Sequence, residues 1–502
     1  MGRKELGIET IRLKDFSKGY FPNKDFDEIP DGGSSNCRHV IWYRSALRKM
    51  FGMDRVFSSA ASPVLGGGLH YLNVENYQVR SFIFGNKFYE DNSGSLVDRT
   101  GAITITSGNL VQAIDHQQGA NQYAIYVNGY DNPWKWTGSG NISALGGSPP
   151  VFSTVAKFHE HIFGAVNEVL YWSDVGDPET WNTSKWIRYF NKNISCVIEH
   201  GESLAVLKTD SIGSITGYTY LDFAAEETEV PNVGCAGRLA ACKAFFGGNP
   251  VVATVDRNGL WIIYEDYSVE KIFGGQYFES FNKNYFSQTV VTYSVVDELL
   301  FVAIPYESST TQNDYLIVVD MKTGAFWPCP DIHSNKIMAM GSMRDDNDEE
   351  YIYFMDNAGF VFKFNRDTKN YHDGSASSAI DSFWKSKRID LEAVYSLQWP
   401  MCISAIEGDW SFDMYVHFGF SSSDGDYGSI GLESDGDLLG STFVLGASVL
   451  GGSQYTFGTA EGVDGFGRFI DISFKNDNLD ESFNIKMAEI QVKERRAGWN
   501  DS

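Results

Sequence analysis

Two stretches of the chain alternate between β-forming residues and a short polar turn. Residues 251–264 read VVATV-DRNG-LWIIY, and residues 351–364 read YIYFM-DNAG-FVFKF. Each has five residues rich in β-branched and aromatic side chains, then Asp-x-x-Gly, then five more such residues. Asp is common at the first turn position because its side chain accepts hydrogen bonds from the backbone of the turn. Gly is common at the last position, where φ is often positive. Both stretches are therefore predicted to be β-hairpins.

Five further segments show weaker forms of the same pattern, at 80–94, 122–136, 161–174, 202–217 and 314–329. The seven hairpins recur about every 40–50 residues, which is typical of a propeller blade of four short strands. We therefore expect an all-β fold with a β-propeller of six to eight blades over residues 61–374. A pair of β-sandwiches is the alternative, since their strands recur every 8–12 residues or so.

The two ends of the chain lack the blade period. Residues 1–60 have mixed character and are predicted to form an N-terminal arm. Residues 375–502 return to strand-like alternation and are predicted to form a β-sandwich-like domain. Within it, residues 427–465 are rich in Gly, Ser and Leu, and we interpret them as a long insertion.

Composition agrees with a β-rich protein that avoids polyanions. The chain of 502 residues has 50 glycines, 15% aromatic residues and a formal net charge of −25. Such a charge disfavours tight binding to duplex DNA, which needs clustered Lys and Arg. Solubility alone would also explain it. The six cysteines are scattered without a CxxC pair, so reduced and mostly buried thiols are expected.

No catalytic constellation stands out, so we expect no enzyme, no cofactor and no metal site. His159-Glu160-His161 would place two imidazoles on one face of a strand, but no third ligand can be named. Two Ser-Asp-Gly-Asp runs, at 423–426 and 434–437, are more typical of turns than of calcium loops. The acidic run 345–350 is predicted to be a solvated hairpin tip.

One loop is a candidate for contacts between subunits. Residues 176–181 read GDPETW, and Asp177, Pro178 and Trp181 would make the loop stiff and exposed. The alternative is that Pro178 and Trp181 hold a long loop onto its own blade. The sequence leaves both interpretations open.

Targeting signals are not evident. The N-terminal residues MGRKELGIETIRLKDF contain no apolar signal-peptide core, and position 6 is Leu rather than the Ser or Thr of a myristoylation motif. No stretch approaches 18 uncharged apolar residues. We expect synthesis in a cytoplasm and no membrane partner.

Three stretches together resemble the β-propeller tail proteins of short-tailed phages, known as nozzle, tail-tube B-type or packaged-DNA stabilisation proteins. They are 27–56, with a proline-led polar opening; 169–217, with a loop of the form YxSxxGDPxxW before a hairpin; and 234–263, with a glycine-bounded strand pair. The segment 169–217 is the most specific. Residues 468–496 also look like the closing strands of these proteins.

The resemblance implies a structural subunit of the virion tail, assembled in the host cytoplasm. It further implies a homohexameric ring beside adaptor and portal-proximal tail proteins and tail fibres or spikes. Such a ring retains packaged DNA and conducts it during ejection, without binding it specifically. A carbohydrate-binding or polysaccharide-degrading tail protein is the alternative function, because such proteins are also β-rich and aromatic.

Overall fold

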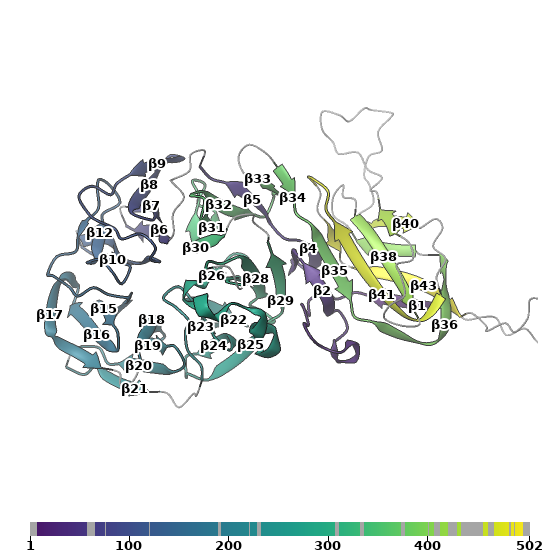
Figure 1. Ribbon diagram of the computed structural model, residues 1–502, viewed down its shortest axis with the longest axis horizontal. Helices are drawn as coiled ribbons and strands as arrows, with labels where there is room; N and C mark the ends of the chain where they lie inside the picture. Colours follow the sequence, from purple (N-terminus) through teal and green to yellow (C-terminus); the bar gives the residue numbers. More distant parts are fainter. Residues whose placement is uncertain are drawn as a thin grey trace, which may run out of the picture. The chain divides into compact units, whose positions relative to one another are not determined.

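The computed structural model describes most of the chain (Figure 1). The described residues are 8–57, 66–75, 77–119, 121–188, 192–219, 221–227, 232–306, 311–331, 336–372, 377–399, 401–405, 412–419, 429–432, 455–459, 466–480, 483–485 and 487–494.

These residues belong to two compact units. The first unit comprises Met1–Gly52, Ala325–Pro330 and Arg366–Ser502, and the second comprises Met53–Gly324 and Asp331–Asn365. The boundaries differ from those expected, because residues 1–52 share a unit with the C-terminal part and do not form a separate arm.

The second unit is built from seven antiparallel sheets in sequence order. The first sheet has β6 (Gly67–Val74), β7 (Tyr77–Phe84), β8 (Lys87–Asn92) and β9 (Ser95–Asp98), and the second has β10 (Gln112–Gln118), β11 (Asn121–Val127), β12 (Trp134–Trp136) and β13 (Ser143–Ala144). The third has β14 (Thr154–Phe158), β15 (His161–Val166), β16 (Val169–Asp174) and β17 (Asp177–Arg188). The fourth has β18 (Ile194–His200), β19 (Ser203–Lys208), β20 (Ile212–Thr216) and β21 (Ala224–Glu227).

The fifth sheet has β22 (Ala241–Phe246), β23 (Asn249–Asp256), β24 (Gly259–Tyr264) and β25 (Val269–Gly274). The sixth includes β26 (Val290–Ser294), β27 (Leu299–Ile304) and β28 (Tyr315–Asp320), and the seventh includes β30 (Ile337–Arg344), β31 (Glu350–Asp356) and β32 (Val361–Asn365). Short 3-10 helices η2 (Gly275–Ser280) and η3 (Lys283–Gln288) connect the fifth and sixth sheets. The seven predicted hairpins lie in seven different sheets. Six of them are formed by the second and third strands of their sheet, and the hairpin at 314–329 begins with the third strand, β28.

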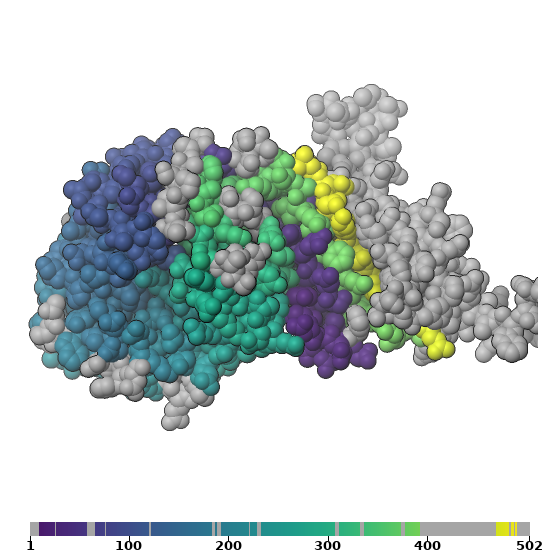
Figure 2. Space-filling view, in the orientation of Figure 1, coloured from purple at the N-terminus to yellow at the C-terminus, as the bar shows by residue number. Residues whose placement is uncertain are grey.

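The seven sheets form a closed cycle. The first strand of each sheet contacts the first strand of the next, from β6 through β10, β14, β18, β22 and β26 to β30, and β30 in turn contacts β6. The sheets follow one another around a common centre in Figure 1. Figure 2 shows the surfaces of successive sheets in sequence order, from dark blue through teal to green.

A strand that precedes the first sheet joins the last one. β5 (Gly52–Arg55) follows β32 in the order of the seventh sheet, and its residues 53–55 lie in the second unit. The backbone amide of Val56 donates to the Val361 carbonyl at 2.8 Å, and the side-chain amide of Asn365 donates to the Asp54 carboxylate at 2.6 Å. The beginning and the end of the second unit are thus held together by strand pairing.

The Asp-x-x-Gly turns form as predicted. The Asp256 carboxylate accepts hydrogen bonds from the backbone amides of Asn258 at 2.7 Å and Gly259 at 3.0 Å. In the 351–364 hairpin, the Asp356 carboxylate accepts from the Phe360 amide at 2.8 Å. Gly359 has a φ of 91°, which L side chains rarely adopt, so glycine is required at this turn position.

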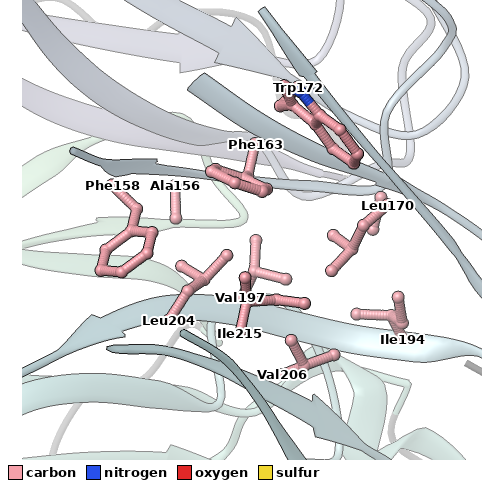
Figure 3. Close-up of a cluster of buried hydrophobic side chains, with 11 residues drawn as sticks. Ala156, Phe158, Phe163, Leu170, Trp172, Ile194, Val197, Leu204, Val206 and Ile215 are labelled. Atoms are coloured by element: carbon pink, nitrogen blue, oxygen red, sulfur yellow. The ribbon is translucent and has the colours of Figure 1, made fainter. Parts of the chain in front are cut away.

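The core of the second unit lies between neighbouring sheets. Figure 3 shows the cluster between the third and fourth sheets, where Phe163 and Leu170 face Val197 and Leu204. All four side chains are buried. Since each sheet has a neighbour on both sides, alternate residues of its strands pack in opposite directions, and both faces are covered.

The first unit centres on a sheet of eight strands. Its order is β1 (Ile8–Leu13), β43 (Ala488–Glu494), β36 (Ile389–Trp399), β41 (Phe466–Asn476), β35 (Ser382–Ser386) and β2 (Ser34–Arg38), with β38 (Phe412–Gly419) on β41 and β39 (Ser429–Leu432) on β38. The other elements of this region are η1 (Phe26–Glu28), β3 (Val40–Tyr43), β4 (Ala46–Lys49), β29 (Phe326–Pro330), β33 (Asn370–His372), β34 (Ser377–Ala379), β37 (Met401–Ala405), β40 (Tyr455–Thr459) and β42 (Asn484–Ile485).

Aromatic side chains fill the core of this unit. Trp384 stacks on Phe474 with ring centroids 5.6 Å apart, and Phe16 meets Trp384 edge-on at 5.0 Å. Most of the expected insertion at 427–465 lies outside the described residues, β39 and β40 excepted. No helix among the described residues is long and apolar enough to cross a membrane.

Candidate functional site

The predicted contact loop is part of a bulged strand. β16 and β17 are joined by a turn at 175–176, after which Asp174 pairs with Asp177 and Ser173 pairs with Trp181. The Asp177 carboxylate accepts hydrogen bonds from the Glu179 amide at 3.0 Å and from the Thr180 hydroxyl at 2.7 Å. These bonds hold residues 178–180 in a bulge, which changes the direction of the strand.

The bulge packs against the second sheet. Glu179 forms an ion pair with Lys135 of β12 at 2.6 Å and accepts a hydrogen bond from the Gly146 amide at 2.8 Å. The Trp181 ring lies 4.9 Å from the ring of Phe152, and its indole N–H donates to the Pro178 carbonyl at 2.7 Å. The loop therefore packs between the second and third sheets of its own chain.

This placement limits what the three predicted residues offer to another subunit. Pro178 is buried, and Asp177 and Trp181 are half-buried. The exposed aromatic side chain of this strand is Trp186, which was not among the residues predicted for subunit contacts. The sequence around Trp186 does not predict its exposure, because the bulge interrupts the alternation of inward and outward residues along the strand.

The pair His159 and His161 does not lie on one strand face, contrary to the prediction. Phe158 of β14 pairs with His161 of β15, so His159 and Glu160 form the two-residue turn, both with positive φ. His161 is buried, and its Nδ1 lies 2.6 Å from the Ser173 carbonyl. In the part of the chain that the structure describes, no three His, Cys, Asp or Glu side chains converge as metal ligands would.

The acidic run 345–350 is a hairpin tip, as predicted. Residues 345–349 join β30 to β31, and Asp346 and Asp348 are exposed. Asp348 pairs with Arg344 at 2.7 Å, and Asp345 pairs with Lys363 at 3.5 Å. Residues of this tip and residues of β7 and β8 in the first sheet line a groove of about 530 Å³.

The first unit contains a larger pocket, of 660 Å³, between its N-terminal strand and residues 386–390. Four basic and four acidic residues line it, and two pairs lie close together: Lys387 lies 2.6 Å from Asp31, and Arg388 lies 2.9 Å from Asp390. Because both signs of charge are already matched, the pocket shows no preference for an ionic ligand.

The cysteines are reduced where they are described. Cys37, Cys196, Cys235 and Cys329 are buried and Cys242 is half-buried, and none of these five forms a disulfide. Burial raises the pKa of Cys37 and of Cys242 to about 12, so these thiols are poor nucleophiles at neutral pH. The side chain of Cys402 and the runs 423–426 and 434–437 lie outside the described residues.

No protein-family model and no curated protein sequence matches the chain. Among solved structures it is similar to PorZ, an essential bacterial surface component of the type-IX secretion system of Porphyromonas gingivalis, at 10% identity and a TM-score of 0.39. That match covers 66% of this chain and 42% of PorZ. A likeness at this level carries no argument about function.

Proposed function

We propose that the chain is a structural subunit of the tail of a short-tailed phage, and that its second unit is a seven-bladed β-propeller. The closed cycle of seven sequential sheets supports the propeller. In a pair of β-sandwiches, sheets would pack face to face in twos. Here each first strand contacts two others, one on either side.

The observation that carries the tail proposal is the segment 169–217, the most specific part of the resemblance. Its Pro-x-x-Trp spacing corresponds to the bulge in which the Trp181 indole donates to the Pro178 carbonyl. The same bulge places the Glu179 carboxylate within ion-pair distance of Lys135 on the second sheet. The motif residues Pro178 and Trp181 therefore belong to a segment that fixes one sheet against the next.

In this proposal, six copies form a ring next to adaptor and portal-proximal tail proteins, and tail fibres or spikes attach nearby. Packaged DNA passes the ring without specific binding, which the net charge of −25 favours because excess carboxylates repel phosphates. The chain acts as a conduit and retainer and not as an enzyme.

A nonsense mutation in the gene of the encoding phage tests this function. Heads should fill with DNA in the absence of the chain and then lose it, so that the DNA becomes sensitive to added nuclease. Wild-type chain supplied in trans should restore nuclease resistance. Mutant particles that retain their DNA and fail only to adsorb would contradict the proposal and favour a carbohydrate-binding protein. Release of oligosaccharide from host capsule by the purified chain would favour a depolymerase.

A further inference from the structure

In each of the first six sheets of the second unit, the turn between the first and second strands and the turn between the third and fourth strands lie at the same end, because the strands are antiparallel. The turn between β30 and β31 is the corresponding turn of the seventh sheet. We name these turns together the turn rim. Their described residues are 75, 93–94, 119, 137–142, 159–160, 175–176, 201–202, 217–219, 221–223, 247–248, 265–268, 295–298, 321–324 and 345–349.

Contacts between sheets show that these turns lie side by side around the ring. The His159 ring lies 4.5 Å from the Tyr218 ring, which joins turns of the third and fourth sheets. The Gly247 amide donates to the Met321 carbonyl at 2.9 Å, which joins turns of the fifth and sixth. The turn rim is therefore one face of the second unit.

This face is strongly acidic. Its described residues include twelve carboxylates and one basic side chain, Lys322; the carboxylates are Glu75, Glu160, Glu202, Asp222, Glu265, Asp266, Asp297, Glu298, Asp345, Asp346, Asp348 and Glu349. The described connections at the other end of the sheets carry six acidic and six basic side chains: Asp131, Glu168, Asp210, Glu279, Asp314 and Asp331 against Arg99, Lys192, Arg238, Arg257, Lys283 and Lys336. Excess acid in the whole chain does not explain such a difference between two ends of the same sheets.

Half of the rim carboxylates are available to a partner. Six of them form no ion pair within the described residues and are exposed: Glu75, Glu202, Asp222, Glu265, Asp266 and Glu349. Hydrogen bonds from Thr219 lower the pKa of Asp222, and hydrogen bonds from Ser268 lower that of Asp266. Both are ionised at neutral pH.

The rim also exposes apolar side chains. Tyr218 and Leu221, in one turn of the fourth sheet, have 62% and 81% of their surface exposed. Val175 is also exposed, and the amide of the next residue, Gly176, donates to the Glu160 carbonyl at 2.7 Å. Val175, His159, Tyr218 and Leu221 thus gather where the third and fourth sheets meet, and we call them the Tyr218 patch. On the sixth sheet, the rim exposes Val295 and Val296.

We propose that the turn rim docks a protein surface rich in Lys and Arg whose apolar side chains cover the Tyr218 patch. An apolar centre within a charged surround is the usual composition of a protein interface. Twelve carboxylates accelerate and orient the approach of a positive surface, and the apolar contact adds the burial that holds it. This inference stands independently of the tail proposal.

The chemistry of the rim disfavours other occupants. Nucleic acids and anionic lipids would be repelled by the carboxylates. A divalent cation needs several carboxylates at one point, whereas these are distributed over six of the seven sheets and no described group of three converges. A second copy offering the same rim would bring like charges together.

A synthetic peptide of alternating Lys and Leu residues is a suitable probe, with a Lys-Ser peptide of equal length and charge for comparison. Binding to the full chain is measured by fluorescence anisotropy at 0.15 M salt. The rim variant is Glu202→Gln with Glu265→Gln and Asp266→Asn. The matched control removes three charges from the opposite end, by Glu168→Gln, Glu279→Gln and Asp331→Asn.

A second variant, Val175→Ser with Leu221→Ser, tests the Tyr218 patch, and Tyr130→Ser is its control, because Tyr130 is exposed at the opposite end. The rim variant should weaken the Lys-Leu peptide about tenfold, and its control less than about twofold. The patch variant should weaken the Lys-Leu peptide but leave the Lys-Ser peptide unchanged.

Four results would overturn the proposal. The first is equal weakening of Lys-Leu peptide binding by the two charge variants, since the attraction would then not be specific to the rim. The second is no binding of the Lys-Leu peptide to the full chain. The third is calcium binding that the rim variant abolishes, which would assign the carboxylates to a cation. The fourth is self-association of the chain in sedimentation that the rim variant abolishes, which would assign the rim to a second copy.

Discussion

Arg80, in the second strand of the first sheet, forms an ion pair with Asp346, in the hairpin tip of the seventh sheet. The same guanidinium pairs with Asp91 on β8 at 2.5 Å and donates to the Arg344 carbonyl at 2.8 Å. Apolar packing accompanies these contacts, because Phe82 and Phe84 of the first sheet share a buried cluster with Tyr353 and Met355 of the seventh. The closure of the ring is therefore both ionic and apolar.

Replacing Arg80 should destabilise the second unit far more than replacing Asp346. Arg80→Met leaves the carboxylate of Asp91, whose side chain is almost fully buried, without its counter-charge, at a cost of about 3 kcal/mol. Asp346 is 75% exposed, so Asp346→Asn should cost less than about 1 kcal/mol. Urea unfolding followed by tryptophan fluorescence measures both. Equal shifts of the two variants would mean that the buried pair is not what stabilises the closure.

The packing between sheets predicts a similar contrast for two phenylalanines. Phe163 is buried between the third and fourth sheets, and Phe163→Ala should lower the free energy of unfolding by about 3–5 kcal/mol. Phe245 lies on the first strand of the fifth sheet and is exposed, so Phe245→Ala serves as the control, with an expected change below about 1 kcal/mol. A small effect of Phe163→Ala would indicate that neighbouring sheets do not pack as described.

Stability should fall in mild acid in part through His116. Burial lowers the pKa of His116, and Lys157 lowers it further, while Glu160 and Asp177 act in the opposite direction. The unfolded chain therefore binds the proton at a higher pH than the folded chain. Stability from this residue is present above a pH of about 6.5 and is lost as pH falls from there through the lower pKa of the folded state.

In His116→Gln, the loss of unfolding free energy between pH 8 and pH 5.5 should be smaller than in the wild type. The value at pH 8, where His116 is neutral in both states, is the internal reference. A wild-type slope in the variant would show that His116 takes up its proton equally well in the folded chain.

The buried thiols of Cys37 and Cys329 should resist alkylation until the chain unfolds. Burial raises the pKa of both thiols and also blocks the access of reagents to them. At pH 8, maleimide should label the peptides of these residues at least about a hundredfold more slowly in the native chain than in urea. Mass spectrometry of the labelled peptides gives the rates. Labelling of the Cys37 peptide at the rate of a free thiol would contradict its burial.

The turns of the hairpins could be predicted from the sequence, because the residues that determine a turn are adjacent along the chain. Asp256 and Asp356 bond the backbone of their turns as the Asp-x-x-Gly pattern indicates. The reduced state of the five described cysteines was also predicted correctly.

Long-range pairing left no such signal. Residues 53–55 join a strand that ends at Asn365, and nothing near either segment in sequence reveals the partner. The turn at His159-Glu160 was missed because Asn and Gly, not His and Glu, are the residues that usually mark positive φ in a two-residue turn. The packing of Trp181 within its own chain was one of two interpretations that the sequence left open. The bulge at 178–180 prevented a choice between them, because a bulge alters which face each residue occupies.

A cryo-electron microscopy structure of the chain within the phage particle would show whether the chain forms a DNA conduit. We predict six copies in a closed ring around the DNA path, each with seven blades, and a channel surface on which Asp and Glu outnumber Lys and Arg. A channel lined mainly by Lys and Arg would slow DNA passage through phosphate contacts and would contradict the proposed conduit. A position far from the particle axis, or absence of the chain from the tail, would contradict it equally.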